Sequence, residues 1–276
     1  MPKAYWNGSY CDESAIHISP RDLGLLRGYA VFDVMPVYRG RPFHTDRHYA
    51  RLARSAETLR LQLPVDAAAF TVIATELSQQ AGLTEATIRT VLSGGSSENG
   101  FRPASGRENF FMLVESVHAP HPSTYQDGVR LITLEYGRSL PQVKFANHAI
   151  AIQDLGRRDA AGAYETLYVN GGMVSECSQS NLFWVRDGQI GTTWDDVLWG
   201  ITQGLVMELA AARGNAVRKT SITLEELFQA DEIFITGSSK ALVPVVEIDG
   251  RKIGNGTVGS ITRELMVAYR EYCVKY

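Results

Sequence analysis

The chain has 276 residues and a formal net charge of −3, with 27 basic side chains against 30 acidic ones and no long block of either sign. This charge distribution disfavours a general nucleic-acid binder, because such proteins cluster Lys and Arg against phosphates. A hydrophobic fraction of 45% is typical of globular proteins, and no apolar run reaches the roughly 18 residues that a membrane helix requires. Three scattered cysteines without metal-ligand spacing, and a start that lacks the features of a signal peptide, lead us to expect a cytoplasmic protein without a metal site.

The N-terminal part predicts an α+β domain over residues 1–117. The Asn7-Gly8 pair lies between short apolar runs and favours a two-residue hairpin turn. Leu52, Ala56 and Leu59 would share one face of an amphipathic helix. The predicted elements are hairpins around Asn7-Gly8 and Arg39-Gly40, helices over 45–61 and 66–81, and strands over 87–95 and 109–116.

A proline-rich polar stretch, "HAPHPSTYQDG", predicts a linker over residues 118–127, which leaves 128–276 as a C-terminal domain. In this domain Thr223 and Glu226 have the spacing of a capping box. The predicted elements are a strand over 129–136, a helix at Lys144, hairpins around 170–172 and 187–188, helices over 203–213 and after Thr223, strands over 231–236 and 243–248, and a last helix from Ser260.

Lys144 is the single lysine of the nearly uncharged stretch "LPQVKFANHAIAI". Phe145, Ala149 and Ile152 follow it at the spacing of a helix face. One interpretation is a lysine that snorkels from the edge of the core. The other is an amine in a partly dry site, whose lowered pKa would allow it to form a Schiff base.

Three further features carry possible chemistry, although each also has an ordinary structural interpretation. Glu176 interrupts a strand-rich apolar context, as a solvated strand end also would. Residues 200–202, "GIT", precede an amphipathic helix, where free amides form an anion site or simply a capped start. Residues 237–239, "GSS", follow a strand and form either an anion-binding turn or a plain one.

The order of these features, lysine, glutamate, "GIT" and "TGS", resembles that of the fold-type IV pyridoxal-phosphate enzymes. The words "VSECSQSNLFWV" and "ADEIFITG" are similar to the class IV aminotransferases, the D-amino-acid and branched-chain aminotransferase family, over nearly the whole chain, from "ISPRDLG" to "VGSITREL". The resemblance implies an α/β (α+β), two-domain fold with pyridoxal 5′-phosphate in the interdomain cleft. It also implies a homodimer whose loops complete the neighbouring site.

The same resemblance implies roles for individual residues. Lys144 corresponds to the lysine that forms the Schiff base and later carries the proton, and Glu176 to the acid that pairs with the pyridine nitrogen. A carboxylate there favours the protonated ring, which then accepts electrons from the substrate. The residues that would bind the phosphate are Arg51, in "RHYARLARSA", and Ile201, Thr202, Ser238 and Ser239.

The spacing from Lys144 to Asn147 resembles that of the D-amino-acid enzymes and of 4-amino-4-deoxychorismate lyase. We expect a D-amino acid to donate its amine to a 2-oxo acid such as 2-oxoglutarate by a ping-pong mechanism. The Arg-x-His carboxylate trap of those enzymes is missing from "SGGSSENGF", and Arg27 and Arg89 are the replacements we predict. Phe32 would line the substrate site. The alternatives are a branched-chain L-aminotransferase, then 4-amino-4-deoxychorismate lyase, whose expected threonine after Phe32 is missing, or a non-catalytic relative that binds the cofactor.

Overall fold

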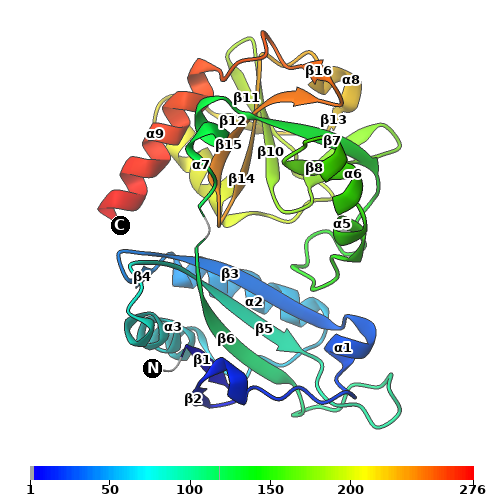
Figure 1. Cartoon of the computed structure of the whole chain (residues 1–276), viewed down its shortest axis with the longest axis vertical. Coiled ribbons are helices and arrows are strands. Elements are labelled where there is room, and N and C mark those ends of the chain that lie inside the picture. Colours follow the sequence, from blue (N-terminus) through cyan, green and yellow to red (C-terminus); the bar gives the residue numbers. More distant parts are fainter. Residues whose placement is uncertain (1–2, 118) are drawn as a thin grey trace. The chain divides into compact units, whose positions relative to one another are not determined.

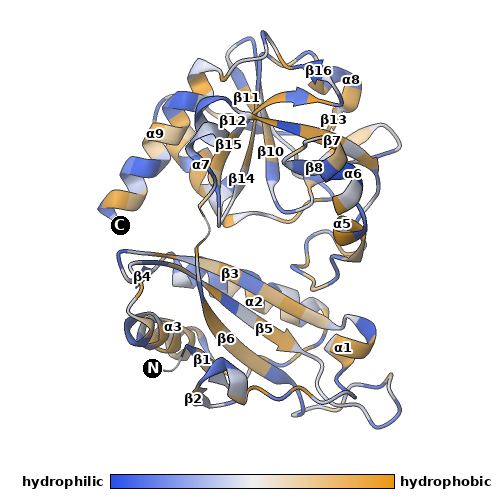
Figure 2. Ribbon diagram, in the orientation of Figure 1, coloured by the Kyte–Doolittle hydropathy of each residue, from blue (hydrophilic) through white to orange (hydrophobic). Residues whose placement is uncertain are grey.

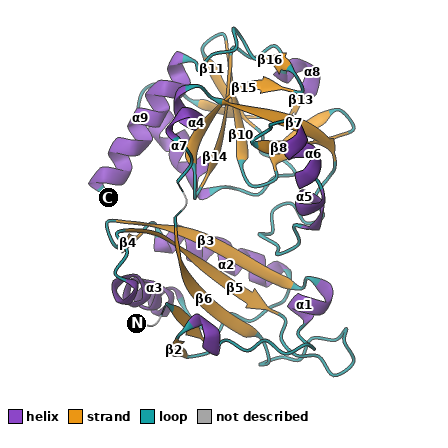
Figure 3. Ribbon diagram, viewed as in Figure 1, coloured by secondary structure: helices purple, strands orange, loops and turns teal. Residues whose placement is uncertain are grey.

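The computed structural model describes residues 3–117 and 119–276. They form two compact units with mixed α/β structure (Figure 3). The first comprises the described residues up to 117 together with Val143–His148, and the second comprises Ala119–Gln142 and Ala149–Tyr276. Lys144 therefore belongs to the first unit although it follows the proline-rich segment. Within the described residues, no helix combines the length and the apolar character needed to cross a membrane.

The first unit is an antiparallel six-stranded sheet in the order β2-β1-β6-β5-β3-β4, with helices α2 and α3 on one face (Figure 1). Its elements are β1 (Ala4–Trp6), β2 (Ser9–Cys11), a 3-10 turn (Glu13–Ala15), α1 (Leu23–Arg27), β3 (Ala30–Tyr38), β4 (Arg41–Pro42), α2 (Thr45–Thr58), α3 (Ala67–Ala81), β5 (Glu85–Ser93) and β6 (Asn109–Ser116). The two predicted hairpins, the two predicted helices and both predicted strands of this part are confirmed.

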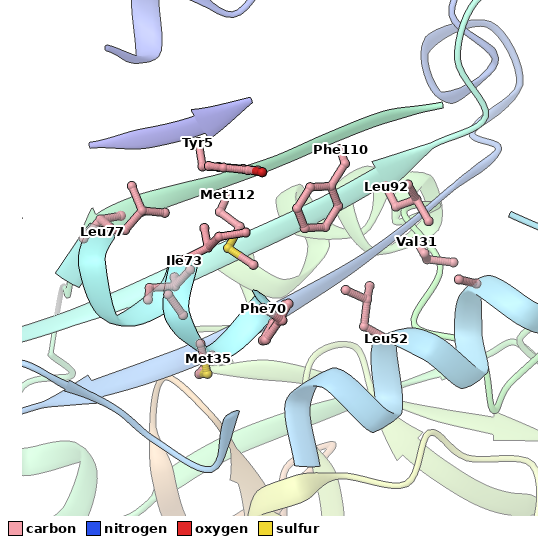
Figure 4. Packing of buried hydrophobic residues seen from close by; sticks show 14 of the residues in the cluster. Tyr5, Val31, Met35, Leu52, Phe70, Ile73, Leu77, Leu92, Phe110 and Met112 are labelled. Atoms are coloured by element: carbon pink, nitrogen blue, oxygen red, sulfur yellow. The ribbon is translucent and has the colours of Figure 1, made fainter. Parts of the chain in front are cut away.

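The core of this unit lies between the sheet and the two helices. Figure 4 shows Val31 and Met35 of β3, Leu52 of α2 and Phe70 of α3 pointing toward one another, and each is at most 1% exposed. Because successive strand residues point to opposite faces, Phe32 lies on the other face of β3. Burial of the apolar helix faces therefore sets the register of β3 and decides which of its side chains stay available for chemistry.

The second unit is built on a ten-stranded mixed sheet whose main path is β12-β11-β10-β14-β15-β7-β8-β9-β13, with β16 paired to β15. The strands are β7 (Val129–Glu135), β8 (Glu165–Asn170), β9 (Met173–Cys177), β10 (Asn181–Arg186), β11 (Gln189–Thr192), β12 (Val217–Lys219), β13 (Ile222–Thr223), β14 (Glu232–Gly237), β15 (Ala241–Ile248) and β16 (Arg251–Lys252). The helices are α4 (Pro122–Gln126), α5 (Ala149–Gln153), α6 (Leu155–Ala160), α7 (Ile201–Ala211), α8 (Leu224–Leu227) and α9 (Ser260–Lys275).

The central strands of this sheet are mainly hydrophobic, whereas α9 alternates between hydrophobic and hydrophilic residues (Figure 2). That pattern follows from a sheet covered on its faces and a helix with one solvated side. The predicted capping box is present, because Thr223 Oγ1 accepts from the Glu226 amide and the Glu226 carboxylate accepts from the Thr223 amide. The predicted strands β14 and β15 and the helices α7 and α9 are also confirmed.

The predicted helix at Lys144 is wrong. Residues 144–146 are extended along the free edge of β3: the Phe32 amide donates to the Lys144 carbonyl at 3.0 Å, and the Ala146 amide donates to the Ala30 carbonyl at 2.9 Å. The helix begins only at Ala149. The reason lies in the sheet: β4 pairs only with the far end of β3, so the near end has open backbone groups that this segment satisfies.

Candidate active site

Lys144 is held firmly within the first unit. Its backbone amide donates to Ser55 Oγ of α2 at 3.1 Å, and its carbonyl accepts from β3 as described above. Its Nζ lies 4.5 Å from the centre of the Phe32 ring, which in turn contacts the His148 ring edge-on at 5.5 Å. An amine over an aromatic face, with its backbone tied to both a strand and a helix, has a defined position for chemistry.

A buried cluster of Asp33, His48 and Arg51 lies on the face of β3 that α2 covers, opposite Phe32. Asp33 accepts from Arg51 Nε at 2.8 Å and Arg51 Nη2 at 3.0 Å, and the His48 Nδ1 to Asp33 Oδ1 distance is 2.5 Å. Each residue is at most 4% exposed. His48, Arg51 and Ser55 recur at helical spacing, so one face of α2 contacts both Asp33 and the Lys144 segment.

Burial acts to raise the Asp33 pKa, but the Arg51 charge and the hydrogen bonds from Arg51 and His48 outweigh it and hold the pKa well below its usual range. Burial lowers the pKa of His48, and the opposing effect of Asp33 does not compensate. A neutral His48 donates from Nδ1 to the carboxylate, which leaves Nε2 as an acceptor. That Nε2 is buried and has no hydrogen-bond partner within the described parts of the chain.

Lowering the pH from neutral to about 5.5 should lower the free energy of unfolding through His48, by up to about 1.4 kcal/mol per pH unit below the ordinary histidine pKa of about 6.5. In this pH window the unfolded chain binds a proton at His48 that the folded chain does not bind, so the free energy of unfolding rises with pH. The loss should be smaller in His48→Gln, as measured by urea unfolding. His17→Gln, at an exposed histidine, should keep the wild-type dependence of the free energy of unfolding on pH. The same dependence in both variants would contradict the assignment to His48.

The two arginines predicted to bind a carboxylate lie on different elements of the first unit. Arg89, on β5, donates from Nε to the Glu115 carboxylate at 3.0 and 3.1 Å, and its side chain is 40% exposed. Arg89 therefore forms a half-exposed ion pair with Glu115. By the β3–β5 register, Arg89 pairs with Val34 and shares a sheet face with Phe32. Arg27 is exposed at the end of α1, where its Nη1 donates to the Leu26 carbonyl at 2.8 Å.

Glu176 lies on β9 in the second unit, is 5% exposed, and is surrounded by donors. Arg138 forms a short ion pair with it, the Leu198 amide donates at 3.2 Å and Asn181 Nδ2 lies at 3.5 Å. Arg138 Nη1 also donates to the Pro141 carbonyl at 3.1 Å. Charge-assisted hydrogen bonds of this kind fix the orientation of the carboxylate.

The N-terminus of α7 offers backbone donors next to this acid. In the part of the chain that the structure describes, the amides of Ile201 and Thr202 have no hydrogen-bond acceptor, and Gly200 has no side chain to cap them. A Cβ at Gly200 would collide with the side chain of Asn181, so only glycine allows this close approach. Free amides at the positive end of the helix dipole form an anion site.

The turn after β14 lies beside this helix end. Asn181, which contacts Gly200, pairs across the sheet with Thr236, directly before the turn that holds Ser238 and Ser239. Thr236 Oγ1 is buried and unpartnered within residues 3–117 and 119–276. The second unit thus brings together four of the residues predicted to bind an anion, namely Ile201, Thr202, Ser238 and Ser239, and connects them to Glu176 through Asn181.

Sequence reasoning assigned no role to His48, Arg138 or Asn181, and it left the role of Asp33 open between the pocket and the dimer. Asn181 stands inside the quoted word "VSECSQSNLFWV", and Asp33 directly follows Phe32, so their neighbours were a usable signal. No local pattern marks Arg138, whereas His48 stands inside the quoted word "RHYARLARSA". Their importance comes from contacts with residues 38 and 15 positions away in the chain.

Comparison with known proteins agrees with this chemistry. The family "Amino-transferase class IV" matches residues 30–248. A protein of Methanocaldococcus jannaschii, provisionally named a branched-chain-amino-acid aminotransferase, is 33% identical over 99% of this chain and 97% of its own length. A D-alanine aminotransferase of Staphylococcus epidermidis is 26% identical over 99% of this chain and 98% of its own.

A solved structure supports the same assignment. The T.th. branched-chain amino acid aminotransferase with pyridoxamine 5′-phosphate is similar at a TM-score of 0.91 and 28% identity, covering 98% of this chain and 93% of the other. The fold predicted from the sequence, that of the fold-type IV enzymes, is confirmed. From the family match and the full-length relatives together, the chain belongs to the class IV aminotransferases, transaminases that depend on pyridoxal 5′-phosphate.

Proposed function

We propose that this transaminase takes the amino group of a D-amino acid, passes it to a 2-oxo acid such as 2-oxoglutarate in two ping-pong half-reactions, and works as a homodimer. Transamination follows from the family, whereas the donor, the acceptor and the dimer are proposed. One observation supports the site assignment. A buried acid and a set of free amides lie together in the second unit, and in the first unit the backbone amide and the carbonyl of Lys144 are both hydrogen-bonded.

The residues of the second unit fit the cofactor. Glu176, a buried carboxylate paired with Arg138, suits a protonated pyridine nitrogen. The amides of Ile201 and Thr202, with the hydroxyls of Ser238 and Ser239, suit a phosphate group. When bound, pyridoxal phosphate supplies the electron sink that makes the substrate's α-carbon acidic.

Arg51 is proposed as a further phosphate ligand. Asp33 holds its Nε and Nη2, so the guanidinium cannot swing, while Nη1 has no hydrogen-bond partner among the described residues. A fixed guanidinium with a remaining donor is well prepared to bind an anion. Asp33 compensates the arginine charge, so its contribution would be directional hydrogen bonding more than net attraction.

Lys144 is proposed to link covalently to the cofactor aldehyde and, once the substrate amine displaces it, to carry the proton. Its neutral Nζ would take the proton from the substrate Cα and deliver it to the cofactor's C4′. Phe32, with its ring 4.5 Å from Nζ, would exclude water on one side of the amine and line the substrate site. An aromatic wall favours donors with apolar side chains.

Two arginines are proposed to bind the substrate carboxylate. If both contribute, Arg27→Ala and Arg89→Ala should each raise the KM for the amino acid by about tenfold, because a charge-assisted hydrogen bond contributes about 1.5 kcal/mol. The kcat should change less. Steady-state kinetics with a D-amino acid would measure this.

Arg130→Ala is the matched control, since Arg130 is also a strand arginine in an exposed ion pair, with Glu247 at 3.6 Å. Its KM should equal the wild-type value. Unchanged KM values in both Arg27→Ala and Arg89→Ala would mean that another cation binds the carboxylate.

The dimer proposal is supported by exposed apolar side chains around Arg27. Leu25 is 68% exposed and Phe101 76% exposed, and Gly100 lies against the side chains of Leu26 and Arg27. Large exposed apolar side chains that gather in one place are typical of interaction surfaces. Such a surface would bury them against a second copy and bring Arg27 close to the neighbouring site.

A branched-chain L-amino acid is the second candidate donor. The 33% identical relative bears a branched-chain name, and the Arg-x-His trap is missing from residues 93–101. The D-amino-acid assignment is supported by the Lys144–Asn147 spacing and by full-length D-alanine aminotransferase relatives.

Single half-reactions distinguish these donors. D-alanine should convert bound pyridoxal phosphate to pyridoxamine phosphate, whereas L-leucine and R-1-phenylethylamine should not. The conversion is measured by absorbance and by the release of the 2-oxo acid. Conversion by L-leucine alone would replace the D-amino-acid assignment with the branched-chain one. Conversion by none of the three would argue for the lyase or a non-catalytic relative.

A further inference from the structure

A buried lysine lies in the turn that joins β14 to β15. Lys240 Nζ donates to Glu165 Oε2 at 2.8 Å, and the two side chains are 9% and 2% exposed. Burial alone would lower the pKa of Lys240, but the Glu165 carboxylate outweighs it and raises the pKa. The two groups therefore form a charged pair inside the second unit, whereas the lysine assigned to the cofactor belongs to the first.

Glu165, the first residue of β8, also accepts hydrogen bonds from the turn between β9 and β10. Ser178 Oγ donates to Oε1 at 3.3 Å, the Gln179 amide makes a short bond to the same oxygen, and Ser180 Oγ donates to Oε2 at 2.8 Å. One carboxylate thus holds two turns that are about sixty residues apart in the chain.

Both turns lead directly into the proposed cofactor site. The β9–β10 turn lies between Glu176 and Asn181, and the β14–β15 turn contains Ser238 and Ser239. Ser238 and Ser239 make no side-chain hydrogen bond among the described residues, so Lys240 is the side chain that anchors their turn to the sheet. Its carbonyl is held too, because Tyr125 Oη donates to it at 3.1 Å.

Stability alone does not account for a pair of this kind. Replacing a buried ion pair by apolar side chains of similar volume is often neutral or stabilising, so we look for the role of this pair in geometry. A lysine fixed by a carboxylate that also binds the other turn sets the separation of the two turns. An apolar contact would leave that separation loosely defined.

We propose that Glu165 and Lys240 form a positioning pair that holds the Ser238–Ser239 turn in place relative to the Glu176 segment, and so sets the affinity of the enzyme for the phosphate group of its cofactor. The inference rests on the proposed phosphate role of Ser238 and Ser239. Neither Glu165 nor Lys240 touches the cofactor in this scheme; both act through the turns.

The test compares pyridoxal phosphate with pyridoxal, which has the same ring and aldehyde but no phosphate. In the full-length double variant Glu165→Gln, Lys240→Met, which leaves no single buried charge, the affinity for pyridoxal phosphate should fall about tenfold, or about 1.4 kcal/mol, while the affinity for pyridoxal stays at the wild-type value. Equilibrium dialysis measures both. Equal ratios of the two affinities in the wild type and the double variant would overturn the inference.

Two further sets of variants separate positioning from general stability. Glu232→Gln removes a carboxylate that caps α9 by accepting from the Ile261 and Thr262 amides, so it should lower stability without changing the affinity ratio. If the double variant behaves like this control, the pair is only structural. Lys240→Arg and Glu165→Asp keep the charges, and they decide the question if the double variant does not fold. We expect them to lose less affinity than the double variant, and only for pyridoxal phosphate. An unchanged ratio of the two affinities overturns the inference.

If the wild type itself binds pyridoxal as tightly as pyridoxal phosphate, the failure lies in the phosphate site assigned to Ile201, Thr202, Ser238 and Ser239. A wild type that prefers pyridoxal phosphate, combined with a double variant that prefers it equally, limits the failure to Glu165 and Lys240. The two results are distinguishable in the same experiment.

Discussion

Lys144→Ala is expected to abolish covalent attachment of the cofactor and to lower kcat by at least about 10² to 10⁴, the usual contribution of a positioned acid–base group. The reason is that one amine is assigned both the covalent link and the proton transfer. Borohydride reduction of the wild type should leave one pyridoxyl group on Lys144, detected by peptide mass spectrometry, and the variant should carry none.

Lys219→Ala is the matched control for this prediction. Lys219 Nζ also lies over an aromatic ring, 3.5 Å from the centre of Trp194, but it belongs to the edge strand β12. Its removal should leave labelling and kcat at their wild-type values. A pyridoxyl group found on Lys240, the buried lysine of the second unit, would contradict the assignment of Lys144 directly.

Glu176→Gln should lower kcat by about 10²-fold, as expected when a fixed charge facing the developing transition-state charge is removed. The new amide side chain would retain hydrogen bonding but not the negative charge that keeps the pyridine nitrogen protonated. Because Arg138 loses its anionic partner, the free energy of unfolding should also fall by about 1 to 3 kcal/mol. Single-turnover kinetics at saturating cofactor isolate the first effect, and urea unfolding the second.

Glu247→Gln serves as the control, since Glu247 is a partly exposed strand carboxylate in an ion pair with Arg130. It should change neither kcat nor the half-reaction rate. If Glu176→Gln loses stability but transaminates at the wild-type rate, Glu176 is a structural partner of Arg138 and the ring nitrogen needs another acid.

Local pattern was enough for most elements because helix caps, Asn-Gly turns and apolar periodicity act over a few residues. The order of Lys144, Glu176, the "GIT" helix start and the "GSS" turn was enough for the family. The helix expected at Lys144 failed because an i, i+4, i+7 pattern cannot show that β3 has an unpaired edge nearby. Tertiary hydrogen bonding overrode the local preference.

The surroundings of Arg89 and Arg51 likewise depend on tertiary contacts and not on local sequence pattern. Alternation along "TIRTVL" told which residues share a face with Arg89 but not which face is the core, and the structure puts Arg89 beside Glu115 on the side opposite α2 and α3. Conversely, Arg51 was named from its motif, yet its tight pairing with Asp33 appears only once α2 packs on β3.

The amino-acid sequence by itself determined the fold type and the cofactor, and it nominated the lysine and the acid that are proposed for the chemistry, because these depend on residue types in a fixed order. Only the tertiary structure decided what surrounds them: the charge-balanced cluster of Asp33, His48 and Arg51, and the carboxylate of Glu165 that holds two distant turns. Such contacts depend on long-range packing, where residues far apart in the chain share burial and charge, and no short-range pattern encodes them.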